Sequence, residues 1–247
     1  MLNAAPPMTF EYSGAPQKSP EWFAIRRGKI TASRLSDWLA TSKAKTSAGK
    51  PLKPRLDYEK ELMFERQFNT SFEYYTNSAM QDGIDYEDYA AKQYAETLPE
   101  GWYPAEVGCW YSDVFVASPD RVIRNDRNAG KIMGLLEVKI LKDNSFTEVL
   151  ISGIPDKHWK QVQGQLFASK LPWCDYVALN FNTKKFVIVR VMPDPEFFEY
   201  LELALLEGLV TEGFALTNLH DIKGEIPEGV ELGVRSDRSD SNLTGGW

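Results

Sequence analysis

Two short segments constrain the fold of this chain most strongly: Ser118-Pro119-Asp120 and the run from Gly134 to Lys139. The first reads as a carboxylate at a bend, and the second as a mostly apolar strand that carries Glu137 and Lys139. Side chains alternate between the two faces of a strand, so this acid and this amine project together while the apolar residues between and beside them point the other way. The sequence therefore predicts a strand that is apolar on one face and charged on the other.

An acid and an amine in so apolar a run are expensive to desolvate for packing alone. If Asp120 folds back beside Glu137, the two carboxylates form an oxygen-rich pocket suited to Mg²⁺ or Mn²⁺, and Lys139 points at whatever the metal holds. The alternative is an edge strand with an ordinary surface salt bridge, which contributes little to stability. These three residues alone do not decide between the two interpretations.

The composition is typical of a globular protein with one large domain or two small ones. The 247 residues are 43% apolar and include 7 Trp, 11 Tyr and 13 Phe, which is ample for a packed core. No apolar run approaches the roughly 18 residues of a membrane span, and the N-terminus does not resemble a secretory signal. Cys109 and Cys174 lie in apolar, strand-like surroundings, and with only two His in the chain they favour buried thiols over a zinc site. We therefore expect a reduced, cytoplasmic protein without a membrane anchor.

The charge is distributed unevenly along the chain. The net charge of −7 argues against a nucleic-acid partner. Residues 21–60, however, carry ten Lys or Arg against four Asp or Glu. A basic segment on an acidic body suits a groove that holds phosphates while the outer surface repels stray DNA. Within this segment, residues 42–56 predict a basic flexible loop, which is either solvated or contacts DNA.

The N-terminal part predicts a flexible arm over residues 1–18 and then a helix over Trp22–Arg27. The residues before this helix, Ser19-Pro20-Glu21, supply a hydroxyl cap and a proline in the first turn. A second, amphipathic helix follows through residues 35–39. Small hydroxyl residues just before it, Thr31 and Ser33, make a phosphate site with nearby Arg26. The alternative is that one of these hydroxyls only caps the helix.

The rest of the chain predicts an α/β fold, with a central mixed β-sheet flanked by helices, in a single domain over residues 19–226 followed by a mobile tail over 227–247. Helices are expected at 58–68, 78–97, 144–151, 156–169 and 195–210, and strands at 107–111, 115–117, 121–123, 137–139, 176–181 and 186–191.

Two of these helices carry polar residues of interest. Glu87 lies one turn after Gly83, although a lone helix glutamate is usually a surface residue. In the helix over 156–169, His158, Gln161 and Gln165 form a polar stripe beside a buried one, and solvent exposure is its simplest interpretation.

Five separated motifs together resemble the phage lambda exonuclease (YqaJ-like) recombinase family, a branch of the PD-(D/E)xK nucleases. They agree in order and spacing over roughly residues 19–200. They are Trp22, Arg26, Gly28 and Ile30-Thr31-Ala32-Ser33; Gly83 with Tyr86-Glu87; Ala117-Ser118-Pro119-Asp120; Leu136-Glu137-Val138-Lys139; and Gln161-Val162-Gln163. The resemblance implies a restriction-endonuclease-like core and a metal-dependent deoxyribonuclease.

The resemblance also implies roles for single residues. Asp120 and Glu137 bind one or two Mg²⁺, for which Mn²⁺ is a possible substitute, with the carbonyl of Val138 as a further ligand. Lys139 polarises the attacking water. Glu87 supports the metal site, and Gln161 orients the water or Lys139. Arg26 and Ser33, with Thr31 beside them, hold the 5′-phosphate. Met80 is an apolar wedge that helps to separate the strands. Two departures from the family pattern are Arg121, where Gly commonly follows the motif's Asp, and His158, where Tyr is common.

The activity implied by the family is 5′–3′ digestion of one strand of linear double-stranded DNA. The implied partners are double-stranded DNA ends, a single-strand annealing protein of a phage or prophage, and two further copies of this chain in a ring-shaped trimer, all in the cytoplasm of a bacterial host. Two alternatives remain open: a site-specific endonuclease of the same fold, and a DNA-end-binding module that has lost catalysis.

Overall fold

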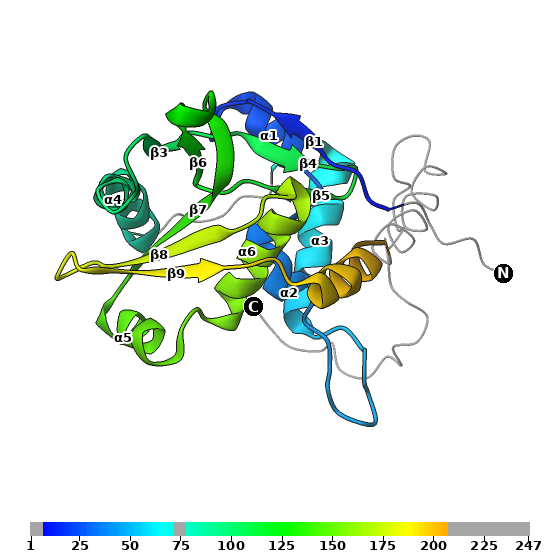
Figure 1. Cartoon of the computed structure of the whole chain (residues 1–247). Coiled ribbons are helices and arrows are strands. Elements are labelled where there is room, and N and C mark those ends of the chain that lie inside the picture. The colour runs from blue at the N-terminus through cyan, green and yellow to red at the C-terminus, as the bar shows by residue number, and fades with distance from the viewer. Residues whose placement is uncertain (1–6, 72–77, 207–247) are drawn as a thin grey trace. The chain divides into compact units, whose positions relative to one another are not determined.

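The computed structural model describes residues 7–71 and 78–206, and the side chains of residues 72–85 lie outside this description. The elements follow the chain as β1 (Glu11–Ser13), α1 (Pro20–Arg26), β2 (Ile30–Thr31), the 3₁₀ turn η1 (Ala32–Arg34), α2 (Leu35–Trp38), α3 (Lys53–Phe68), α4 (Ser78–Ala95), β3 (Trp102–Ala105), β4 (Cys109–Tyr111), β5 (Phe115–Ala117), β6 (Arg121–Asn125), the 3₁₀ turn η2 (Asp126–Asn128), β7 (Lys131–Leu141), α5 (Asp143–Ser152), α6 (Asp156–Ser169), β8 (Cys174–Asn180) and β9 (Phe186–Val191) (Figure 1). Residues 195–206 are helical as well.

The strands form two mixed sheets. The larger has the order β3-β6-β7-β8-β9, in which only β7 and β8 run parallel, and the helices α5 and α6 connect those two strands. The smaller has the order β1-β4-β5-β2, in which only β2 and β5 are parallel. The predicted α/β class with a mixed, helix-flanked sheet is confirmed, and the second small sheet is an addition that the sequence did not indicate.

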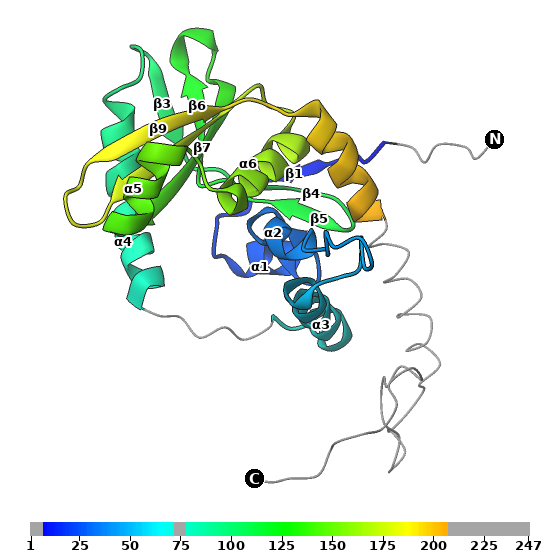
Figure 2. The same ribbon diagram turned by 90° about the horizontal axis from the view of Figure 1, so that it is seen from below.

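The larger sheet is buried on both faces, and the alternation of β7 separates them. Leu136 and Val138 lie in an apolar cluster with Ala90 and Tyr94 of α4. Leu135, on the opposite face, lies in another cluster with residues of α5, α6 and β8. Figure 2 shows α6 between this sheet and the small one, where it also packs on α2 and η1. Glu137 and Lys139 therefore face α6, as the strand period predicts.

The segment over residues 118–120 joins the two sheets, because β5 belongs to the small sheet and β6 to the large one. Gln17 fixes this segment: its Nε2 donates to the carbonyl oxygens of Pro119, at 2.7 Å, and Val107, at 3.2 Å. Residues 11–13 of the expected flexible arm also pair with β4. Within the described part of that arm, residues 11–13 thus form the edge strand β1 of the small sheet.

Several boundaries differ from the sequence prediction. The expected loop over 42–56 ends earlier, because α3 already begins at Lys53; Pro54 fits the first helical turn, and Lys53 and Lys60 pair with Asp57. β2 and β3 were not predicted, since neither has a clear period of two. Both cysteines are buried and free, as expected. Within the described residues, no helix combines the length and apolar character that a membrane crossing requires.

Candidate active site

Asp120 immediately precedes β6 and lies at the edge of β7 where pairing with β6 has stopped. The last paired residues of these two strands are Arg121 and Leu136. Past this point the backbone N–H of Val138 donates to Asp120 Oδ2 at 2.6 Å instead of to a strand. Because the N–H and the carbonyl of one strand residue point to the same edge, the Val138 carbonyl faces this edge too. The structure therefore brings Asp120 and the backbone of Val138 together, as expected if Asp120 folds back beside Glu137.

Glu137 is buried, with 1% of its surface exposed, and its carboxylate accepts three hydrogen bonds from side chains. Oε1 accepts from Lys139 Nζ and from Gln161 Nε2, both at 2.5 Å. Oε2 accepts from Gln165 Nε2 at 2.6 Å. An ionised carboxylate has about four acceptor positions, so most of its capacity is used by these donors. A surface salt bridge, the alternative interpretation of this motif, is wrong for so buried an acid.

The charges at this site shift one another's pKa values. Burial, followed by the charge of Glu137, raises the pKa of Asp120 well above its ordinary value. Burial acts to lower the pKa of Lys139, but the neighbouring Glu137 and Asp120 outweigh it and raise that pKa above the ordinary value. Lys139 is therefore a cation at neutral pH and can donate a hydrogen bond, and the two carboxylates repel each other unless a cation or a proton intervenes.

Glu87 is held by Arg121, the residue at which the chain departs from the family pattern. Arg121 Nη1 donates to Glu87 Oε1 at 3.0 Å and to the backbone carbonyl of Asp120 at 2.6 Å, and Nη2 donates to Asp88 at 2.5 Å. Glu87 also contributes to the raised pKa of Asp120. The arginine thus ties α4 to the turn that carries Asp120, and a glycine could not do so.

A cavity of about 470 Å³ is lined by α1, η1 and α3, and it contains Arg26, Thr31 and Ser33. The hydroxyls of Thr31 and Ser33 lie 3.1 Å apart, and the backbone N–H of Thr31 donates to the hydroxyl of Tyr58 at 3.0 Å. Neither η1 nor α2 has a side-chain cap, so the simpler capping role for these hydroxyls is not realised. The three residues predicted to form a phosphate site do line one cavity.

Arg26 is a desolvated cation in this cavity. Burial lowers its pKa. Its guanidinium stacks on Trp22, 4.1 Å from the ring centroid, and Nη1 donates to Ser118 Oγ at 3.0 Å. Trp22 Nε1 donates to the same hydroxyl at 3.1 Å. Among the described residues no carboxylate forms an ion pair with Arg26. Ser118 lies two residues before Asp120, so these two hydrogen bonds connect Arg26 and Trp22 to the segment that carries Asp120.

The other departure, His158, lies behind the carboxylates on α6. Its Nδ1 lies 2.8 Å from the hydroxyl of Tyr176, which is paired with Glu137 in the register of β8 and β7. Burial, followed by the charges of Lys139 and Lys157, lowers the pKa of His158 to about 4. The imidazole is therefore neutral at physiological pH. The side chain of Met80, the predicted wedge, lies outside the described residues.

The donor set at Asp120 fits a small, hard cation. This donor set has only two carboxylate side chains, and among the described residues no group of three or more His, Cys, Asp and Glu could hold a metal. Two carboxylates and one carbonyl, with the remaining positions left to water and substrate oxygens, are what Mg²⁺ commonly uses at phosphate-processing sites. A cation there would also relieve the repulsion by Glu137, which adds to burial in raising the pKa of Asp120.

The profile of the YqaJ-like viral recombinase domain matches residues 21–171, more than half of the chain. The chain belongs to this family. The matched range includes the cavity around Arg26, the carboxylates and α6. No curated protein sequence matches the chain significantly.

Solved structures show the same fold. The chain is similar to an alkaline exonuclease from Laribacter hongkongensis, with 27% identity and a TM-score of 0.68 over 82% of this chain and 97% of the other. A structure of LHK-Exo, as that exonuclease is called, in complex with dAMP gives 28% identity and a TM-score of 0.66 over 82% and 98%. A phage-related exonuclease from Haemophilus somnus is 14% identical, with a TM-score of 0.55 over 76% and 97%, and shows the fold alone. The restriction-endonuclease-like core expected from the sequence is thereby confirmed.

Two residues of the site were not assigned from the sequence. Gln165 is fully buried and bonded to Glu137, whereas its polar stripe had been interpreted as solvated. Its spacing of four from Gln161 was the available signal, since residues i and i+4 share a helix face. Ser118, the contact between Arg26 and the Asp120 turn, had no such signal, because only the tertiary fold brings α1 next to it.

Proposed function

We propose that this chain is a Mg²⁺-dependent 5′–3′ exonuclease. It degrades one strand of linear double-stranded DNA from a 5′-phosphorylated end and leaves a 3′ single strand for annealing during phage recombination. Membership of the YqaJ-like family and the similarity to alkaline exonucleases support a nuclease. The direction and the end specificity rest on the arrangement of the described side chains.

The observation that carries the proposal is the desolvated guanidinium of Arg26 next to the segment that bears Asp120. Among the described residues Arg26 forms no ion pair, although the charge of Glu65 in the same cavity acts on it, and a phosphate would offset the cost of its desolvation with charge-assisted hydrogen bonds. The hydroxyls of Thr31 and Ser33 line the same cavity and add donors for a terminal phosphate. Because Arg26 bonds to Ser118, two residues before Asp120, a strand anchored here by its 5′-phosphate would have its first phosphodiester near the carboxylates.

Hydrolysis at this point uses the residues around β7. Asp120, Glu137 and the carbonyl of Val138 would hold the cation, which lowers the pKa of water and neutralises charge on the phosphorus oxygens when bound. Lys139, a cation at neutral pH, donates to the attacking water or to a non-bridging oxygen. Gln161 donates to the same Glu137 Oε1 as Lys139 and so orients the oxygen that accepts from the ammonium. Glu87, held by Arg121, adds negative charge that favours cation binding.

The partners in this proposal are double-stranded DNA ends, a single-strand annealing protein and further copies of this chain. A ring-shaped trimer around the DNA, as the family resemblance implies, would keep the enzyme on one molecule through many cycles. The annealing protein would coat the 3′ strand as it is exposed. The proposed location is the cytoplasm of the bacterial host, where the recombining phage DNA lies.

The test compares linear and covalently closed circular DNA in Mg²⁺, with the linear duplex labelled at either the 5′ or the 3′ end of one strand. We expect a 5′ label to be released as mononucleotide at once, a 3′ label to be released last, and the closed circle to stay intact. Lys139→Ala is expected to bind the ends without digesting them. Cleavage of the closed circle would favour an endonuclease, and absence of digestion by the wild type would indicate an end-binding module.

A further inference from the structure

Helix α6 presents two glutamines to the same carboxylate. Gln161 and Gln165 lie one turn apart on one face of the helix, and each donates its side-chain amide to Glu137, the first to Oε1 and the second to Oε2. Lys139 donates to Oε1 as well. Gln165 is therefore the side-chain donor that fixes the second oxygen among the described residues.

The amide of Gln165 is not explained by packing. The residue is 0% exposed, and its Oε1 is one of two buried side-chain nitrogen or oxygen atoms among the described residues that have no hydrogen-bond partner. An unpartnered buried acceptor disfavours folding, and an apolar side chain of similar length would fill the space without it. The opposite orientation of the amide would turn an oxygen toward the carboxylate. In the orientation found, Gln165 Nε2 donates to Glu137, and Gln165 Oε1 is left without a hydrogen bond.

We propose that Gln165 is a positioning residue that sets the orientation of the Glu137 carboxylate for a divalent cation. With Oε2 bonded to Gln165 and Oε1 bonded to Gln161, the carboxylate cannot turn about its terminal bond without losing a donor. This inference rests on the proposed function, because it needs the cation site. Partners that orient a metal ligand typically change metal affinity or activity by about 10–100-fold when they are removed.

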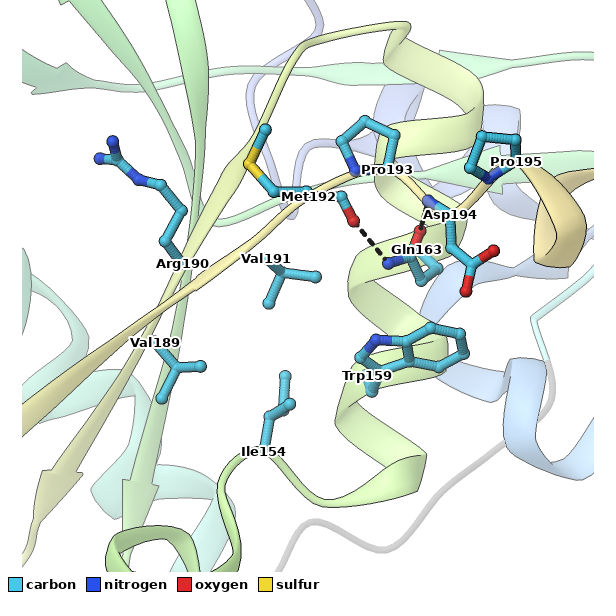
Figure 3. A pocket seen from close by; sticks show the side chains of 10 residues that line it. All are labelled: Ile154, Trp159, Gln163, Val189, Arg190, Val191, Met192, Pro193, Asp194 and Pro195. Carbon is cyan, nitrogen blue, oxygen red and sulfur yellow. Dashed lines mark hydrogen bonds between the residues drawn. The ribbon is translucent and has the colours of Figure 1, made fainter.

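Gln163 supplies a matched control on the same helix. It is 1% exposed, and its amide bonds to the backbone of the segment after β9: Nε2 donates to the Met192 carbonyl at 2.9 Å, and Oε1 accepts from Asp194 N–H at 3.0 Å (Figure 3). Gln163 and Trp159 both line a cavity of about 420 Å³. Removing this amide deletes two partly buried hydrogen bonds without affecting the contacts of Glu137.

The experiment is calorimetric titration of the full-length, metal-free chain with MnCl₂ in the absence of DNA, for the wild type, Gln165→Met and Gln163→Met. Thermal unfolding and circular dichroism establish that each variant is folded. We expect Gln165→Met to weaken Mn²⁺ binding by roughly 10–100-fold. Gln163→Met should lower the thermal midpoint and leave Mn²⁺ affinity within about twofold. Equal Mn²⁺ affinity of Gln165→Met and wild type would overturn the proposal, and so would equal weakening by both variants.

The titration distinguishes the cation site from the role of Gln165. If the wild type does not bind Mn²⁺, the cation site of the proposed function is wrong, and the role of Gln165 falls with it. If the wild type binds and Gln165→Met binds equally well, only the role of Gln165 is wrong. Should Gln165→Met not fold, solvent exchange of the Gln165 side-chain amide is followed by NMR in the wild type. Protection that persists in saturating Mg²⁺ supports the proposal, and loss of protection on adding Mg²⁺ contradicts it.

Discussion

Replacing Arg26 tests whether the cavity around it recognises a 5′-phosphate. Arg26→Gln keeps a side chain that can donate to Ser118 but removes the charge. A hydrogen bond to a charged group contributes about 1.5–3 kcal/mol, and 1.4 kcal/mol corresponds to a factor of ten. Loss of one such bond to a terminal phosphate should therefore lower kcat/KM on 5′-phosphorylated duplexes by roughly 10–100-fold. On 5′-hydroxyl duplexes there is no terminal phosphate to lose, so kcat/KM should change little.

The same variant should leave the stability of the DNA-free protein nearly unchanged. Burial lowers the pKa of Arg26, and among the described residues it has no ion-pair partner, so removing the charge also removes a desolvation cost. The lost stacking on Trp22, about 0.5–2 kcal/mol, acts in the opposite direction. We expect a net change in unfolding free energy within about 1 kcal/mol. A large loss of activity is then not attributable to unfolding.

The assay measures kcat/KM on duplexes that differ only in the 5′ end, for the wild type, Arg26→Gln and Arg127→Gln. The last is the control, because Arg127 is 64% exposed and pairs with Glu100 on the surface. The ratio between phosphorylated and hydroxyl ends should fall by about 10–100-fold in Arg26→Gln alone. An equal loss on both kinds of end, with the ratio unchanged, would refute the phosphate role.

Three further predictions concern the fold and the carboxylates. Gly134→Ala would place a Cβ 2.4–2.5 Å from three ring atoms of Trp173, so we expect the free energy of unfolding to fall by about 2–3 kcal/mol and the Tm by roughly 5–10 °C. The control Gly14→Ala, whose Cβ meets nothing nearer than 4.0 Å, should leave the Tm unchanged in thermal unfolding. The pKa of His158 is lowered to about 4 in the folded protein, so the unfolded chain binds a proton at this histidine at higher pH than the folded chain does, and the free energy of unfolding should fall as pH drops from about 6.5 to 4. In urea titrations, His158→Gln should lack this contribution of at most a few kcal/mol to the pH dependence, and an unchanged pH dependence would contradict the prediction. Asp120→Ala should abolish digestion and keep binding to DNA ends in a gel-shift assay, and digestion at the wild-type rate would remove Asp120 from the site.

The part of the site that the sequence predicted depends on short-range periodicity. Glu137 and Lys139 share a face because strand side chains alternate, and α6 has the predicted bounds, Asp156–Ser169. The bend at Asp120 was evident from the proline before it. Each of these features is encoded within a few neighbouring residues, so each can be predicted from the sequence.

The features that were missed depend on contacts between distant segments. Gln17 bonds to the carbonyl of Pro119, 102 positions away, and nothing in the proline-containing arm indicates this. The sequence predicts Gln165 to be solvent-exposed, because nothing within the helix indicates that Glu137 of β7 lies opposite its polar stripe. Arg121 was recognised as a departure, but its pairing with Glu87 and Asp88 needs α4 to lie beside β6. Periodicity predicts which face a residue is on, and tertiary packing decides what that face meets.

The most direct measurement is a crystal structure of the chain grown with MnCl₂ and a 5′-phosphorylated duplex, with the manganese located by its anomalous scattering. Convergence of the side chains on one cation predicts a peak within coordination distance, about 2.0–2.5 Å, of Asp120 and Glu137 oxygens. The ammonium of Lys139 should lie beside the bound phosphodiester. Manganese bound elsewhere, or Asp120 and Glu137 directed to separate regions, would contradict the nuclease site.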